Sequence, residues 1–189
     1  MPKTKILKEL AERAAKGDDL AMDYVSRMKR AKESDYMTGM TLYHGTASDI
    51  DAFDLSRGGE VSNSPVGKLG VSLGVDPETA GEFARLAGDA GANIIPVYHR
   101  ASKPARIELD GTEMNHEIAS TVQNAWDQGF DAIKFDNYTT PGGKTGQSFV
   151  LVKNPNQVRS VNAAFDPSKK ESSDLLASVA PAGVGLGAL

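Results

Sequence analysis

Thr41-Leu-Tyr-His-Gly-Thr46 marks the point at which the sequence changes from a helical pattern to a strand-forming one. The aromatic and β-branched residues at its start predict a short strand that runs directly into His44-Gly45-Thr46. Before it, residues 4–33 predict two short helices, the first ending at Gly17. We therefore assign residues 1–35 to an N-terminal helical segment and residues 36–168 to the main domain.

Short strands, glycine turns and two further helices follow this segment. We expect strands over residues 70–73, 94–98, 105–109, 132–135, 148–153 and 157–161, and helices over residues 76–88 and 117–128. Asp76 is a good N-cap for the first of these helices, and Pro96 restricts its strand to an edge or a bulge. Many short strands with few helices between them predict an α+β fold, not a doubly wound parallel sheet.

Composition limits the classes of protein to consider. A chain of 189 residues is enough for one domain of about 100–200 residues with an attached tail. The net charge of -4 argues against a protein that binds nucleic-acid backbone, and the absence of cysteine excludes disulfides and thiolate catalysis. Three scattered histidines give no metal site. The opening residues lack a secretion pattern, so we expect a cytoplasmic protein.

His44, Gly45 and Thr46 place an imidazole, an unobstructed backbone amide and a hydroxyl in one loop. Such a group can hold a polar ligand, especially ribose hydroxyls or an amide. A histidine satisfied by its local structure, with a glycine needed only for the turn, is the alternative. We expect His99 to be exposed at a strand edge and Trp126 to pack in the core.

The order of the later segments supports the ligand-binding interpretation of His44-Gly45-Thr46. The segments that carry a family likeness are Tyr43-His-Gly-Thr46, Phe53-Asp54, Gly70-Val-Ser-Leu73, Asp76-Pro-Glu-Thr-Ala80, Phe83-Ala84, Gly129-Phe-Asp-Ala132, Phe149 to Val152, Pro155-Asn-Gln-Val-Arg-Ser160 and Phe165-Asp166. Together they resemble the ADP-ribosyltransferase domains of polyvalent proteins in phages and other mobile elements, relatives of the diphtheria-toxin and poly-ADP-ribose-polymerase branch. The likeness covers about residues 35–168.

This resemblance implies a split β-sandwich of short strands with NAD, the co-substrate, held in the cleft. His44 matches a histidine that bonds the adenosine ribose, and Gly45 matches a residue whose backbone contacts the nicotinamide amide. Ser72 and Phe83 match two usually aromatic walls of the nicotinamide ring, of which only Phe83 is aromatic. Tyr98 or Tyr138 are the candidates to replace the missing ring.

Gln147 matches an acidic residue that holds the nicotinamide ribose and stabilises the cation formed during bond cleavage. A glutamine keeps the hydrogen bond but brings no formal charge to an oxocarbenium-like transition state. Thr145 stands where arginine-modifying relatives carry a glutamate, which speaks against an arginine acceptor. Arg57 could pair with the NAD pyrophosphate, since a guanidinium matches phosphate oxygens, or it could be a solvated loop residue.

The resemblance thus implies an NAD-dependent mono-ADP-ribosyltransferase that needs no metal and modifies a host macromolecule, preferably a protein, in toxin-like fashion. Catalysis would rest on His44 and Gln147. The alternatives are an inactive NAD- or ADP-ribose-binding module, a structural phage-particle component, or an NAD glycohydrolase. Residues 169–189 form an apolar, Gly- and Ala-rich tail. The tail is either a loose end or a peptide that contacts a partner, a membrane or the phage particle.

Overall fold

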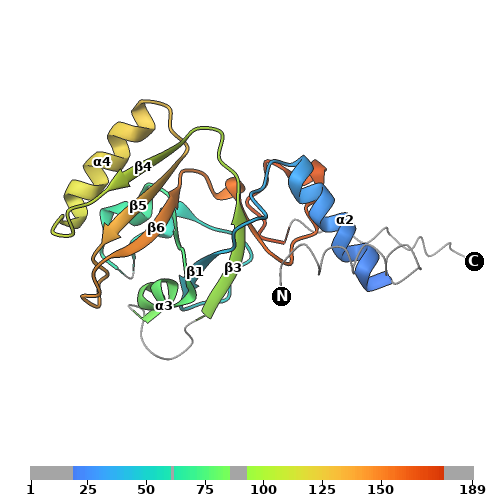
Figure 1. Ribbon diagram of the computed structural model, residues 1–189, viewed down its shortest axis with the longest axis horizontal. Coiled ribbons are helices and arrows are strands. Elements are labelled where there is room, and N and C mark those ends of the chain that lie inside the picture. The colour runs from blue at the N-terminus through green and yellow to red at the C-terminus, as the bar shows by residue number, and fades with distance from the viewer. Residues whose placement is uncertain (1–18, 61, 86–92, 177–189) are drawn as a thin grey trace, which may run out of the picture.

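Figure 1 shows the protein as a computed structural model that describes residues 19–60, 62–85 and 93–176. The described helices are α2 (Asp19–Glu33), α3 (Pro77–Arg85) and α4 (Asn115–Asp127). The strands are β1 (Leu42–Thr46), β2 (Val71–Gly74), β3 (Asn93–His99), β4 (Pro104–Glu108), β5 (Ala132–Tyr138), β6 (Gln147–Val152) and β7 (Val158–Ser160). Short 3-10 turns lie at Leu55–Arg57, Pro65–Lys68, Pro155–Gln157 and Pro167–Lys169.

The predicted α+β class is confirmed, and each predicted strand is present within a few residues of its expected bounds. Asp76 caps α3 as expected, because its carboxylate accepts the amide of Thr79 at 2.8 Å. The first predicted helix, with its end at Gly17, and the expected end of α3 at Gly88 lie outside the described residues.

The seven strands form one mixed sheet in the order β4-β5-β6-β2-β1-β3-β7. Only β4 and β5 are parallel. β2 is paired with β6 along its whole length, and β1 likewise with β3, but β1 and β2 meet at the single Cα pair Tyr43–Gly74. The sheet is therefore two half-sheets joined at one point, the split arrangement that the family likeness implies.

Pro96 lies on β3, which pairs with β1 on one side from Asn93 to Val97 and with β7 on the other side from Val97 to His99. The Pro96 carbonyl accepts the amide of Val161, so its nitrogen also faces away from β1. Because β7 does not extend along the first half of β3, the proline removes no ladder hydrogen bond. Among the described residues no strand pairs with residues 93–96 on this side, which agrees with the edge position that the proline predicts.

Two apolar clusters cover opposite faces of the sheet. α4 packs on the first, which contains Phe135, Phe149 and Leu151. Trp126 of α4 is buried there as expected and donates its indole N–H to the Leu69 carbonyl at 2.9 Å. The second cluster holds the residues that alternate with these on the strands, with Leu42 and Leu73 at its centre.

His99 is buried, not exposed: only 4% of its surface is accessible. It ends β3 opposite Val158, and its carbonyl accepts the amide of Met37. The segment between α2 and β1 therefore covers the strand end that the sequence pattern leaves open.

Residues 169–176, which the sequence assigns to the tail, pack against the main domain. Leu175 is 2% exposed within the second apolar cluster, and its backbone bonds Asp51 at 2.7 Å and Ser160 at 3.0 Å. The guanidinium of Arg159, 1% exposed, donates to the Lys169 and Ser172 carbonyls. Residues 177–189 lie outside the described residues.

Within the described part of the chain, no helix combines the length and apolar character needed to cross a bilayer.

Candidate functional site

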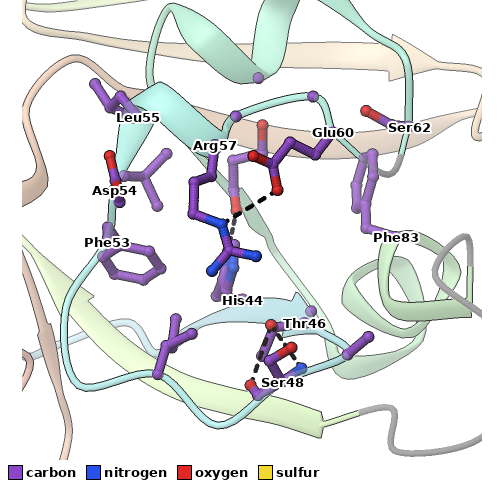
Figure 2. Close-up of a pocket in the computed structure, with 18 of the residues that line it drawn as sticks. His44, Thr46, Ser48, Phe53, Asp54, Leu55, Arg57, Glu60, Ser62 and Phe83 are labelled. Carbon is purple, nitrogen blue, oxygen red and sulfur yellow. Dashed lines mark hydrogen bonds and ion pairs between the residues drawn. The ribbon is translucent and has the colours of Figure 1, made fainter.

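A cavity of about 280 Å³ opens where the two half-sheets diverge. After Tyr43, β1 separates from β2, and the gap lies between residues 44–46 and residues 70–72. The rest of the lining comes from the loop and 3-10 turn over residues 47–60, from Ser62 and Gly67, and from Phe83 of α3. Figure 2 shows Phe53 and Phe83 at opposite sides of this cavity, with His44 between them. The cavity is present because β1 and β2 are paired at Tyr43–Gly74 and diverge beyond that pair.

His44 lies in the cavity lining and bridges the split. Its Nδ1 lies 3.0 Å from the Ser72 carbonyl oxygen, so Nδ1 carries the proton and donates. The Phe53 ring packs against the imidazole at 4.7 Å between centroids and 82° between planes. Burial lowers the pKa of His44 below 6.5, although the hydrogen bond to Ser72 acts against this. The neutral imidazole therefore leaves Nε2 as an acceptor, and no described residue bonds it.

Gly45 is required by packing. A Cβ at this position would overlap the backbone carbonyl of Ala80, because α3 lies directly against β1. As a glycine, residue 45 presents only backbone atoms to the cavity that it lines.

Thr46 and Arg57 also line the cavity, and each already has a partner. The Thr46 hydroxyl bonds the backbone of Ser48 at 3.2 Å. The Nε of Arg57 lies 3.1 Å from the Glu60 carboxylate, with the guanidinium in front of His44 in Figure 2. An anionic ligand would have to compete with Glu60 for this exposed guanidinium.

A second cavity of about 480 Å³ adjoins the first. Both are lined by Ser62, Gly67, Ser72 and Phe83. Beyond Phe83 the second cavity has an aromatic wall of Tyr138 and Phe149. The two cavities thus form one groove that runs from β1 across β2 to the ends of β5 and β6.

Gln147 lines neither cavity. It begins β6 opposite Tyr138, on the sheet face of Phe149, whereas His44 shares its face with Leu42. Its Oε1 lies 3.0 Å from the Thr79 hydroxyl, and its Nε2 donates to the Thr145 carbonyl at 3.1 Å. The structure therefore brings His44, Ser72 and Phe83 together, and it leaves the carboxamide beside the groove, turned toward α3.

Thr79, which sequence reasoning missed, connects Gln147 to the start of α3. Its buried hydroxyl lies 2.9 Å from Asp76 Oδ2 as well as 3.0 Å from Gln147 Oε1. One hydroxyl proton serves only one of these two acceptors at a time. Burial acts to raise the pKa of Asp76, but the hydrogen bonds from Thr79 outweigh it and lower that pKa. The signal available in the sequence was the Asp-Pro-Glu-Thr start of a helix, considered together with the strand that Gln147 begins.

The two tyrosines considered as ring walls lie in different places. Tyr98 packs against Phe165 at 6.3 Å, in the cluster beneath α2. Tyr138 lies nearly parallel to Phe83, 6.2 Å between centroids and 13° between planes. Only Tyr138 lines the groove.

The described residues contain no group of three or more His, Asp or Glu side chains placed to hold a metal ion.

Comparison with protein families identifies a match. A family model described as ADP-ribosyltransferase in polyvalent proteins matches residues 38–165, more than half of the chain. These residues include all seven strands together with α3 and α4 and exclude α2. No curated protein and no solved structure matches the chain.

Proposed function

The chain belongs to the ADP-ribosyltransferase family of polyvalent proteins, and from this premise we propose that it is an NAD-dependent mono-ADP-ribosyltransferase. The acceptor in this proposal is a macromolecule, preferably a protein, of a bacterial host.

The reaction breaks the bond between the anomeric carbon of the ribose and the nicotinamide nitrogen. The bonding electrons pass to the pyridinium ring, which leaves as neutral nicotinamide, so the leaving group needs no metal. The acceptor nucleophile then bonds the anomeric carbon from the opposite face and loses its proton. The protein's task is to position the dinucleotide and to stabilise the positive charge that develops on the ribose.

The observation that carries the proposal is the acceptor atom of His44 in the split of the sheet. Nδ1–H is held by Ser72, which fixes the ring, and Nε2 has no described partner. A ribose hydroxyl is the kind of donor that such an atom binds, and the backbone of Gly45 is accessible beside it.

Gln147 is the proposed catalytic residue whose position and chemistry fit the reaction least well. To hold the ribose, its carboxamide has to give up or share the bond with Thr79. Without a formal charge, the stabilisation of the developing cation falls by about 3 kcal/mol, or about 100-fold in rate. We therefore expect a slow transferase. Thr145 supplies no acid to activate a guanidinium, which favours an acceptor other than arginine.

Nicotinamide release from NAD in the presence of host lysate tests the proposal, with mass spectrometry of lysate proteins labelled from NAD to identify the acceptor. His44→Ala should abolish release and labelling. His116→Ala is the matched control, because His116 is exposed at the start of α4, outside both cavities. Equal activity of the His44 variant and the wild type would contradict the assignment.

A second candidate, an NAD- or ADP-ribose-binding module without transferase activity, is favoured by the contacts of Gln147. Its carboxamide is already bonded to Thr79 and Thr145. Dinucleotide binding that depends on His44, with no nicotinamide release under any acceptor condition, would select this function.

A further inference from the structure

Tyr138 reaches the groove through an irregularity in β5. On this strand Ile133 and Phe135 face the α4 side of the sheet, and Lys134 and Asp136 face the other side. Regular alternation would send Tyr138 to the side of Asp136. It lies instead in the same cluster as Phe135 and Phe149.

A bulge causes this reversal. The pairing of β5 with β6 shifts by one residue between Phe135–Phe149 and Tyr138–Gln147. Asn137, between them, has a φ of 59°, the left-handed conformation that residues other than glycine rarely adopt. Its side chain donates to the Leu109 carbonyl at 2.9 Å, which holds the irregular backbone in place. A strained residue that redirects its neighbour into a groove points to a functional use of that neighbour.

The surroundings of Tyr138 leave its hydroxyl for a ligand. The side chain is 9% exposed, and its ring packs edge-on against Phe149 at 4.8 Å. No described residue bonds the hydroxyl, and its oxygen is not among the buried unpartnered side-chain atoms, so it is open to the groove that Tyr138 lines. Burial also raises the pKa of Tyr138 above 10, so the hydroxyl remains a donor at neutral pH.

β2 offers no ring of its own to the groove, because residue 72 is a serine. Phe83 lines both cavities, and the nearly parallel ring of Tyr138 extends its surface into the second one. A third ring between the two would need about 7 Å, twice an aromatic contact distance of about 3.5 Å, and the centroids are only 6.2 Å apart. The pair is therefore a continuous wall and not a clamp.

We propose that Phe83 and Tyr138 together form the wall against which the nicotinamide ring of NAD binds, and that the Tyr138 hydroxyl donates to a polar group of the dinucleotide. Tyr138 thus replaces, from β5, the aromatic residue that β2 lacks. This inference rests on the proposed use of NAD.

The first test measures the affinity of the full-length protein for NAD by calorimetry. Tyr138→Leu, which removes the ring and the hydroxyl, should weaken binding about tenfold, whereas Tyr138→Phe, which keeps the ring, should weaken it about two- to fivefold. Tyr98→Leu is the matched control, since Tyr98 packs beneath α2 away from the groove. It should leave the affinity unchanged. Wild-type affinity in Tyr138→Leu would overturn the inference and leave the proposed function standing.

A second test needs no variant and so does not depend on the folding of Tyr138→Leu. In the wild-type protein with NAD bound, nuclear Overhauser effects should join the nicotinamide ring protons to the rings of Tyr138 and Phe83. Effects only to other groove residues, such as Phe53, would overturn the inference alone. Failure of the wild type to bind NAD at all would overturn both the inference and the proposed function.

Discussion

His44 combines a fixed orientation with a perturbed pKa, and its charge state governs what it can bind. Burial holds the pKa of the imidazole below 6.5, so the neutral form persists to lower pH than in an ordinary histidine. Protonation would turn Nε2 from an acceptor into a donor.

We therefore expect NAD affinity to stay constant as the pH falls from 7.5 to 6.5 and to decrease only at lower pH. Titration calorimetry across this range checks the prediction, with His116→Ala expected to follow the wild-type curve. A loss of affinity that begins above pH 6.5 would contradict it.

Gln147 shares the Thr79 hydroxyl with Asp76, and this limits what a carboxylate at position 147 can do. In Gln147→Glu, two carboxylates would compete for one hydroxyl proton, and their repulsion would raise the pKa of one of them. We expect Gln147→Glu alone to raise nicotinamide release little. Addition of Asp76→Asn, which keeps a good helix cap, should raise the rate toward about 100-fold over wild type.

The measurement is the initial rate of nicotinamide release for wild type, both single variants and the double variant. Additive effects of the two substitutions would refute the coupling through Thr79.

At the scale of elements, the bulge in β5 lowers the stability of the protein locally, because it holds Asn137 at a positive φ. A left-handed conformation costs a residue with a Cβ about 1–2 kcal/mol, and asparagine tolerates it better than most. Asn137→Ala should lower the free energy of unfolding by about 1–2 kcal/mol, because it keeps the strain and loses the bond to Leu109.

Asn137→Gly is the matched variant, since glycine adopts this φ freely and loses only the side-chain bond. Urea denaturation should therefore rank the stabilities as wild type, then Asn137→Gly, then Asn137→Ala. If the alanine variant were as stable as the glycine variant, the strain argument would fail.

Elements with a strong local pattern were predictable from the sequence. Alternating apolar residues located β2 and β5, a continuous apolar run located β6, and the capping by Asp76 located α3. The bulge at Asn137 was not predictable, because it depends on the register with β6 and on a bond to Leu109. The position of Tyr138 depends on that bulge, so the sequence left it undecided against Tyr98.

At the scale of the whole molecule, His99 and Leu175 are buried by contacts with segments that lie far away in the sequence. His99 was expected at an exposed edge, yet it is buried where the chain between α2 and β1 bonds its backbone carbonyl. Leu175 was expected in a separate tail, yet it fills the second core cluster. Local composition carries no information on either contact, since both join segments far apart in the sequence.

The burial of His99 makes the stability of the whole domain depend on pH. Burial lowers the pKa of His99 from 6.5 to about 4, against a smaller opposing effect of Asp131. Since the unfolded chain binds the proton more readily, stability falls as the pH falls below 6.5. The contribution lost between pH 7.5 and 5 is about 2 kcal/mol.

Denaturant unfolding at pH 7.5 and at pH 5 measures this loss. His99→Phe should remove most of it, because the variant has no proton to gain and no unpaired buried Nδ1. The residual slope should reflect His44, whose pKa is lowered in the same direction. An unchanged loss in the variant would refute the assignment to His99.

The contact of Leu175 with the loop around Asp51 has a consequence for biosynthesis. Leu175 packs in the same cluster as Phe53, which in turn supports the imidazole of His44. During translation, the ribosome adds Leu175 more than a hundred residues after residues 44–46, which line the groove. A chain that stopped before residue 175 would therefore carry all the described strands but lack the Leu175 side chain that packs in the cluster with Phe53.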